Sequence, residues 1–495
     1  MLCYVCMVIK FVEVMLRKIT LVFVFTLLSI SWGLGQESWS LEKCITYAQQ
    51  NNLTVKQSQY QISNAELTLR GAKLNQYPSL NGSISGVNQF GRTIDPTTNT
   101  FNNQQILSNS ISLDARITVY NGNRIKNQIE QGKLDLEAAN LDAQATINDI
   151  SLNVAAAYLN ILLAEEQLEI ANKALEQSQE QLDQTDKLIQ AGTRPENERL
   201  DILAQVAQNE QTIIDAQNLV ISNYLNLKQL LELDPKTSIK IQRPDIDVPV
   251  ADPNAFKLEE IYTRALSSQP QVRAGEVRVK SAELDVDISR AGLLPSITAF
   301  GSISSNYSSF AKDFANPDFS NVSVQPGQAQ PVLINGEDAT IASFETSGIV
   351  FPDKPYFDQM EENFGQLLGV SLNIPIFNNG QSRVAMERAK INVLNTQVSN
   401  KQVKNTLKTN IQRAIADARS AKESWEAAQR SVDAAQAAFD NAQKRIDLGA
   451  INTLEYSTSR NTLDRTKVDL VRAKYQYIFN LKVVDFYLGK EITIN

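Results

Sequence analysis

The residue types that carry most enzyme chemistry are scarce in this chain of 495 residues. The chain contains no histidine, which excludes histidine-activated serine or cysteine nucleophiles, histidine-ligated zinc and histidine proton shuttles. Its three cysteines are Cys3, Cys6 and Cys44, and no glycine-rich nucleotide-binding loop is visible. The sequence therefore predicts a protein that is not an enzyme and that binds neither a cofactor nor a metal ion.

Carboxylates are the remaining candidates, and three of them follow glycine-containing breaks between long helical patterns. Glu198 and Asp201 follow the break at 191–195, and Glu455 follows the break at 448–452. Paired carboxylates act in glycoside hydrolysis, but no acid pair here stands apart from solvated helix faces. Acidic residues in a first helical turn also simply stabilise the helix dipole. The net charge of −8 disfavours nucleic acid as a partner.

Long segments with almost no helix breakers flank both breaks. They are 123–190, 196–234, 381–448 and 450–488. Apolar residues recur every seven positions, as in a coiled coil. In the first segment these residues are Ile161, Leu168, Leu175, Leu182 and Ile189. At 1.5 Å per residue such a helix is about 100 Å long, so each half of the chain is predicted to contain an extended helical hairpin.

The two hairpin tips contain residues suited to a sharp reversal. Gly192 and Gly449 can adopt the left-handed conformation that ends a helix, and they are followed by Thr193 and Ala450. Pro195 suits the start of the returning helix. We therefore expect these residues to form the turn of each hairpin, in addition to any role in binding.

Four shorter segments alternate apolar and polar residues and are predicted to be strands. They are 80–90, 107–119, 297–307 and 364–377. Their lengths suit either a soluble sandwich or membrane-spanning strands, which need about 9–11 residues. The polar faces consist mainly of Ser, Asn and Thr, which suits a wet lumen. No apolar stretch of 18 residues is apparent after residue 35, so no spanning helix is expected.

Four strands cannot close a membrane barrel, because about eight is the practical minimum. An open sheet edge in lipid would leave backbone groups unpaired, which is prohibitive. A dimer would supply eight strands and an interior filled by side chains, whereas a trimer would supply twelve and leave a pore. We infer a trimer.

The chain has two halves with one plan. Leu41-Glu42 matches Leu258-Glu259 and Ala65-Glu66-Leu67 matches Ala282-Glu283-Leu284, both at an offset of 217. We expect a first repeat at 36–234, a proline-rich linker at 235–257 and a second repeat at 258–495. The second repeat includes a connection at 308–362 with five prolines and a net charge of −7. We expect this connection to be structureless and extracellular, with linkage alone or binding as alternative roles.

The first 35 residues have the pattern of a secretory signal peptide. A basic segment, Met15-Leu16-Arg17-Lys18, precedes a short apolar run and the small residues Gly33 and Gly35. We expect cleavage after Gly35, and Met15 is an alternative start. Only Cys44 would then remain, which excludes an intramolecular disulfide.

Local motifs recur in order in both halves. Pro78-Ser79 and Pro295-Ser296 enter strands, whereas Tyr120-Asn121-Gly122 and Phe377-Asn378-Asn379-Gly380 leave them. With the tip glycines, this order resembles the outer membrane efflux protein family, the TolC type. The resemblance implies a homotrimer in the outer membrane, with a twelve-stranded barrel in lipid and an α-barrel tunnel across the periplasm. It also implies a passive duct for efflux or type I secretion that docks an inner-membrane pump through a periplasmic adaptor.

The resemblance also implies roles for the tip residues. Gly192, Thr193, Gly449 and Ala450 would contact the adaptor, and Glu198, Asp201 and Glu455 would form an acidic ring at the tunnel entrance. Thr458 stands where relatives have a second carboxylate, and Ile451 stands where they have an arginine. The rival hypothesis is a periplasmic or surface coiled-coil protein with a structural role and no pore. The alternating strands argue against this rival, because a rod does not need them. The sequence leaves the cargo open.

Overall fold

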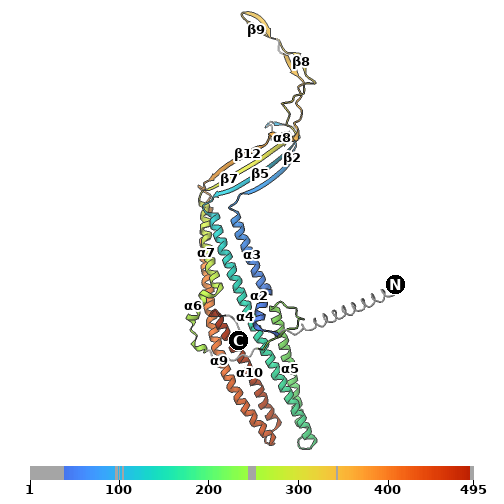
Figure 1. The fold of residues 1–495 in the computed structure, drawn as a ribbon, viewed down its shortest axis with the longest axis vertical. Coiled ribbons are helices and arrows are strands. Elements are labelled where there is room, and N and C mark those ends of the chain that lie inside the picture. The colour runs from blue at the N-terminus through green and yellow to red at the C-terminus, as the bar shows by residue number, and fades with distance from the viewer. Residues whose placement is uncertain are drawn as a thin grey trace, which may run out of the picture. The chain divides into compact units, whose positions relative to one another are not determined.

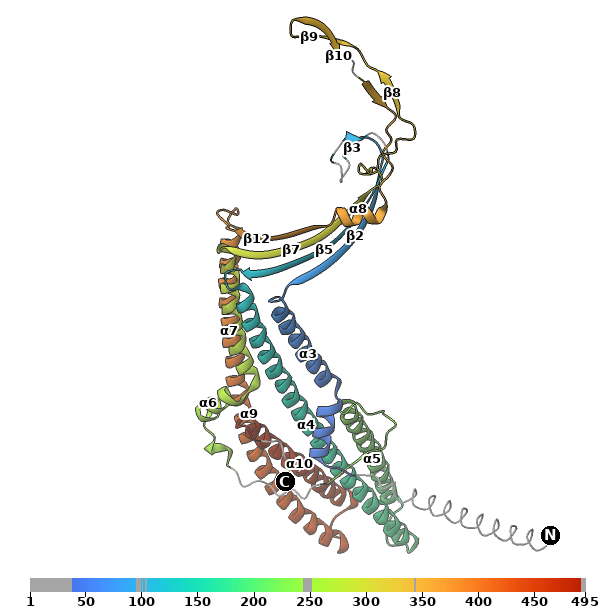
Figure 2. The ribbon, with the colours of Figure 1, turned by 45° about the horizontal axis from the view of Figure 1, so that its top comes forward.

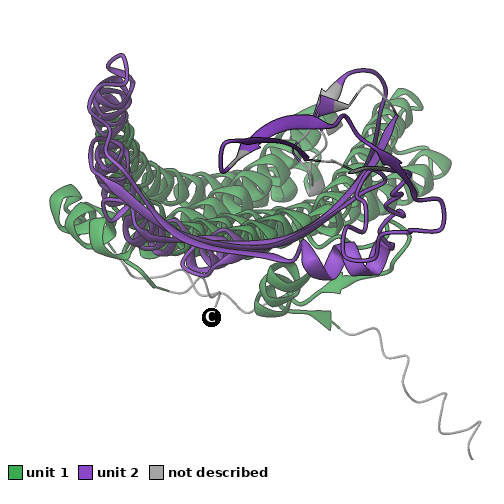
Figure 3. Cartoon of the chain, turned by 90° about the horizontal axis from the view of Figure 1, so that it is seen from above, with its two compact units in different colours: residues 1–65, 136–279, 396–495 green, residues 66–135, 280–395 purple. Residues whose placement is uncertain are grey.

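A computed structural model describes residues 38–94, 99, 101–102, 105–243, 252–341 and 344–490. The predicted signal peptide and part of the predicted linker lie outside these residues. The chain forms two compact units (Figure 3). Unit 1 contains the described parts of 1–65, 136–279 and 396–495, and unit 2 contains those of 66–135 and 280–395. Each unit therefore combines segments from both halves of the sequence.

The same order of elements occurs in both halves (Figure 1). The first half contains α2 (Leu41–Asn51), α3 (Leu53–Leu74), β2 (Ser79–Gln89), β5 (Ile106–Tyr120), α4 (Arg124–Gln190) and α5 (Asn197–Leu230). The second half contains α6 (Leu258–Ser268), α7 (Pro270–Arg290), β7 (Ser296–Ser308), β12 (Gly365–Asn373), α9 (Gln381–Asp447) and α10 (Thr453–Tyr487). The prediction of a mainly helical chain with long hairpins is confirmed, and the four predicted strand segments correspond to β2, β5, β7 and β12.

Unit 1 has two main hydrophobic cores, and the sequence repeat aligns them. Cys44, Ala48 and Val55 pack in the first core, against α4 and α5. Ile261, Ala265 and Val272 lie exactly 217 positions later and pack in the second core, against α9 and α10. The short parallel strands β1 (Ser38–Trp39) and β6 (Lys240–Ile241) lie beside the first core. Residues at equivalent positions of the repeat therefore pack against equivalent helices in each half.

The break between α2 and α3 in the first half is held in the same way as the break between α6 and α7 in the second half. The side-chain N–H of Asn52 donates to the carbonyl of Leu230 at 2.9 Å. The side-chain oxygen of Asn52 caps the next helix by accepting from the N–H of Thr54. In the second half, the amide of Gln269 donates to the carbonyl of Phe486 at 3.4 Å. Each side chain is buried and attaches the break to the end of the returning helix.

One helix corrects an expectation from the sequence. Among the described residues, α4 contains a window long and apolar enough to cross a membrane, although none was expected. Of that window, 56% is buried within the fold. Val154, Tyr158, Ile161 and Leu162 of α4 are buried in the first core. The apolar window is therefore explained by packing in a helical core.

Unit 2 contains an antiparallel sheet in the order β12-β7-β5-β2, which curves along its length (Figure 2). Residues opposite each other on neighbouring strands share a face, so the register assigns the faces. One face carries Leu80, Ile84, Ile111, Leu113, Ile303, Leu368, Val370 and Leu372. The opposite face carries Asn81, Ser83, Ser110, Ser112, Asp114, Thr298, Ser302 and Ser304. The predicted division into an apolar and a polar face is present in the sheet.

Two local features shape this sheet. β12 ends at Asn373, earlier than expected, because Pro375 has no N–H to continue the ladder. Phe300 lies on the mainly polar face and covers Gly369, where an added Cβ would come within 2.6 Å of its ring. Gly369 therefore provides the space that the aromatic ring occupies.

The connection between β7 and β12 contains more structure than expected. It contains β8 (Ser323–Pro326), β9 (Gln330–Ile334), β10 (Glu337–Ile341), β11 (Phe344–Ser347) and α8 (Tyr356–Glu362). β8 pairs with β11 and β9 pairs with β10, both antiparallel. In the first half, the connection contains the pair β3 (Thr93–Ile94) and β4 (Phe101–Asn102). The expectation of a structureless connection was therefore wrong, because these residues pair with one another.

Candidate functional site at the hairpin tips

Both hairpin tips in unit 1 have the same backbone geometry. Gly192 has φ +71° and Gly449 has φ +69°. The N–H of Gly192 donates to Ile189 O at 2.9 Å, and the N–H of Thr193 donates to Leu188 O at 3.0 Å. This pair of bonds forms a Schellman motif, in which a left-handed glycine satisfies the last carbonyls of the helix.

The second tip repeats the motif. The N–H of Gly449 donates to Ile446 O at 3.0 Å, and the N–H of Ala450 donates to Arg445 O at 2.8 Å. The four predicted docking residues, Gly192, Thr193, Gly449 and Ala450, are all exposed in the chain. Their backbones are therefore fixed and their surfaces are accessible.

The predicted entrance carboxylates have different surroundings. Glu198 is half-buried and accepts from Arg194 Nη1 at 3.1 Å. Glu455 is exposed, and its carboxylate accepts from Arg445 Nη1 at 3.0 Å. Its backbone N–H donates to Asn452 Oδ1 at 2.8 Å, which caps α10. Asp201 is exposed, and no ion pair involves it within the described part of the chain. Two of the three carboxylates, Glu198 and Glu455, are thus partly neutralised by arginines of the same chain.

A cavity of about 540 Å³ separates the two hairpins near their tips. Its lining is mostly polar and comes from all four hairpin helices. The lining includes Gln177, Gln181, Thr185, Glu198, Gln443, Tyr456 and Arg460. The structure places Glu198 in this lining, whereas Asp201 and Glu455 are not part of it.

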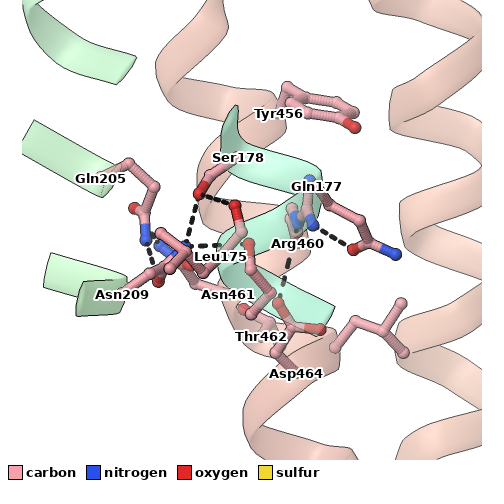
Figure 4. Close-up of polar contacts among 12 residues, drawn as sticks. Leu175, Gln177, Ser178, Gln205, Asn209, Tyr456, Arg460, Asn461, Thr462 and Asp464 are labelled. Carbon is pink, nitrogen blue, oxygen red and sulfur yellow. Dashed lines mark hydrogen bonds and ion pairs between the residues drawn. The ribbon is translucent and has the colours of Figure 1, made fainter. Parts of the chain in front are cut away.

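A polar layer, buried at Arg460 and Ser178, connects the hairpins next to this cavity (Figure 4). Arg460 of α10 is only 7% exposed and donates to the side-chain oxygen of Gln177 on α4. Its second partner is Asp464, one turn along α10, at 3.7 Å. Burial raises the pKa of the Asp464 carboxyl, while Arg460 and Lys467 lower it. The guanidinium thus attaches hairpin 2 (α9 and α10) to hairpin 1 (α4 and α5).

Amides extend the polar layer to α5. Asn461 donates to Gln205 Oε1 at 2.9 Å, and Gln205 donates to Asn209 Oδ1 at 3.0 Å. Asn209 in turn donates to Ser178 Oγ at 3.0 Å. Sequence reasoning did not identify the contacts of Ser178 or its polar partners. A signal was present in the sequence, because Ser178, Gln205 and Asn209 are polar residues at helix positions that face other helices.

An apolar cluster stabilises the second tip. Ile451 is 7% exposed and packs with Ala442 and Tyr456, next to Phe439 and Ile446. Thr458 donates its hydroxyl to Leu454 O at 2.8 Å within α10. Ile451 and Thr458 therefore have structural roles within the chain, Ile451 in packing and Thr458 in a hydrogen bond within its own helix.

The described residues contain no group of three or more acidic or cysteine side chains arranged to hold a metal ion. Cys44 lies in the first core, where burial raises the pKa of its thiol to about 12. A protonated, enclosed thiol is a poor nucleophile.

A sheet with one exposed apolar face, together with long helical hairpins, is the architecture expected of a chain that forms an outer-membrane channel. A model of the family described as "Outer membrane efflux protein" matches residues 44–232, 261–340 and 362–490, so the chain belongs to that family. The predicted family is confirmed. The chain is thus an efflux channel protein of the outer membrane. No protein of curated function matches the sequence.

Solved channel structures have the same fold. The chain is similar to CusC, with 19% identity and a TM-score of 0.70, over 93% of this chain and 96% of that chain. The CmeC outer membrane channel of Campylobacter jejuni has 17% identity and a TM-score of 0.69, over 91% of this chain and 85% of that chain. The outer membrane protein VceC of Vibrio cholerae has 14% identity and a TM-score of 0.70, over 92% and 97%.

Proposed function

We propose that three copies of this chain form one passive duct, with twelve strands in the outer membrane and a helical tunnel in the periplasm. The observation that carries the proposal is the open four-stranded sheet. Within the described residues, the outer strands β2 and β12 each pair with a single neighbour in this sheet. Unpaired strand edges are not tolerated in lipid, so the sheet needs copies of itself to close.

The exposed side chains favour the same conclusion. Ile84, Leu368, Val370 and Leu372 share the apolar face, and all are exposed in the single chain. Monomeric soluble proteins rarely expose contiguous apolar patches of this kind. The opposite face carries hydroxyl and amide side chains, which suit a wet lumen. A barrel of about twelve strands leaves room for an aqueous channel, whereas eight strands fill their own interior.

The hairpin tips are the proposed contact with a periplasmic adaptor, which would connect the duct to an inner-membrane pump. Gly192, Thr193, Gly449 and Ala450 are exposed on turns that are fixed by hydrogen bonds. Glu198, Asp201 and Glu455 lie within the first turns after these tips and would give the entrance an acidic character. The energy for transport would come from the pump, because the duct is passive.

The sequence organisation completes the proposal. Residues 1–35 would be a signal peptide that is removed on export, and mass spectrometry of the mature N-terminus would test this. The repeats at 36–234 and 258–495 would each contribute one strand pair and one hairpin to the duct. A coiled-coil protein without a pore is not favoured, because its function would not require the two-faced sheet.

Deletion of the gene and re-expression of the full chain test the function directly. We expect the deletion strain to retain more of at least one compound from a panel of antimicrobials, dyes and metal ions, and re-expression to reverse this. Purified chain in planar bilayers should also conduct ions. Unchanged susceptibility together with the absence of conductance would contradict the proposal.

A further inference from the structure

We propose that α8 is an interfacial anchor, which lies on the outside of the barrel and binds the outer surface of the membrane. This inference rests on the proposed function, because it assumes that the apolar face of the sheet is in lipid. All of the residues involved belong to unit 2. The proposed occupant of the exposed side of α8 is the boundary between lipid headgroups and acyl chains.

The first argument is the face on which α8 packs. The Tyr356 hydroxyl donates to Asn109 Oδ1 at 3.0 Å, and the Tyr356 ring lies 4.9 Å from the Tyr307 ring. Asn109 and Tyr307 are opposite each other in the register of β5 and β7. Because side chains alternate along a strand, they share the face of Ile111, Leu113 and Ile303. α8 therefore contacts the apolar face of the sheet.

A second contact places α8 on the same side. The Ser305 hydroxyl donates to the carbonyl of Met360 at 2.6 Å, and Ser305 is opposite Ile111. Seen from above, α8 lies on the convex side of the curved strands (Figure 3). The convex side of a strand layer faces outward when the layer closes into a barrel, so α8 does not obstruct the lumen.

The helix is held firmly in this position. Gln359 is only 2% exposed, and its amide pairs with the backbone of Ser308, accepting from N–H at 2.9 Å and donating to O at 3.0 Å. Asn363 donates to Asn306 O at 2.7 Å. β12 pairs with β7 only as far as Ser304, so these amides continue the ladder where β12 is missing. A helix bound in this way is a rigid support for what it exposes.

The exposed side of α8 has the composition of a membrane interface. Phe357 is 81% exposed, and its ring packs against Tyr356 at 5.5 Å. Asp358 and Glu361 are exposed beside it and would point to water or headgroups. Outer-membrane barrels carry aromatic girdles at both boundaries of the apolar band. Tyr356 and Phe357 continue the apolar face of the strands at the end from which the long connection leaves.

The family model does not cover residues 341–361, which include most of α8. The strands on which α8 packs are covered by it. Most of α8 therefore lies in a segment that the family match leaves uncovered, next to strands that it covers.

Spin labels on the full-length channel test the anchor. The variants Phe357→Cys, Ile84→Cys and Asp338→Cys would each be made with Cys44→Ala and reconstituted in phosphatidylethanolamine and phosphatidylglycerol vesicles. Collision rates with oxygen, which concentrates in lipid, and with a water-soluble nickel chelate would be compared for each label. Ile84 reports the strand face, and Asp338, in β10, reports the exposed connection.

We expect the label at 357 to favour oxygen over nickel, at a depth shallower than that of the label at 84, and the label at 338 to favour nickel. If the label at 357 matched that at 338 while 84 remained in lipid, the anchor would be overturned and the barrel retained. If the label at 84 itself favoured nickel, the barrel in the proposed function would fail, and the anchor with it. Burial of 357 from both reagents would indicate a protein partner and would also overturn the anchor.

Discussion

The guanidinium of Arg460 on α10 donates a hydrogen bond to the side chain of Gln177 on α4 and so connects the two helical hairpins of unit 1. Both residues also line the cavity between the hairpins. A buried charge that loses its partners is costly, whereas a charge in water is not. The attachment of hairpin 2 to hairpin 1 therefore depends on this contact more than on the exposed ion pairs nearby.

Arg460→Ala should loosen this attachment. Loss of a buried hydrogen bond to a charged group costs about 1.5–3 kcal/mol, which corresponds to roughly a tenfold to 150-fold increase in local opening. Hydrogen exchange measured by mass spectrometry should accelerate in residues 453–464. Arg472→Ala on the same helix is the matched control, because Arg472 is exposed and pairs only at 3.7 Å with Asp469. Equal exchange in the two variants would contradict the role of Arg460.

The tip glycines should tolerate asparagine but not valine. Gly192 and Gly449 have positive φ, and an added Cβ would meet nothing within 4 Å at either position. The cost of substitution is therefore a backbone cost of about 1–2 kcal/mol, which asparagine largely avoids. We expect Gly449→Val to reduce capture of the channel by the proposed periplasmic adaptor and Gly449→Asn to preserve it. Equal capture by both variants would show that the turn conformation does not matter for docking.

Ile451 should contribute more to the second tip than its exposed neighbour. Ile451 is 7% exposed, whereas Leu454 is 67% exposed. Truncation of a buried isoleucine to alanine costs about 2–5 kcal/mol, and this site at the end of a small cluster should give the lower end of that range. Ile451→Ala should accelerate exchange in 448–456, while Leu454→Ala should change it little. The reverse order would show that the cluster is not what stabilises the tip.

Cys44 predicts a specific dependence of stability on pH. Burial raises the pKa of the folded thiol from 9.0 to about 12. The folded state therefore holds the proton more tightly than the unfolded state, so the stability from this group is complete below pH 9 and falls as the pH rises toward 12. The free energy of unfolding of the natural chain should fall more steeply over this interval than that of Cys44→Ala. Parallel curves for the two proteins would contradict the assignment.

The sequence predicted the fold well because its signals were long and repeated. The heptads from Ile161 to Ile189 and the scarcity of helix breakers predicted a long helix, and α4 is 67 residues long. Alternation placed β5 within one residue of its observed ends. The duplication predicted that the two halves pack alike, and Cys44 and Ile261 do occupy equivalent positions in the two cores. The acidic ring is a property of several chains together, so Glu198, Asp201 and Glu455 remain a prediction.

The sequence could not predict contacts that join distant segments through single polar atoms. Arg460 and Gln177 are 283 positions apart, and neither belongs to a motif. Gln359 likewise replaces a missing strand through its side-chain amide, which no periodicity encodes. Pairing within 308–362 was missed because prolines and acidic residues suggested disorder, although each short strand had a partner nearby.

Single-particle electron cryomicroscopy of the full chain, extracted from outer membranes, tests the central claim most directly. The account predicts three chains around one axis, with β2 of each protomer paired to β12 of the next in a closed barrel of twelve strands. A single chain with open sheet edges, a closed barrel of another size, or recovery of the protein only from the soluble fraction would contradict it.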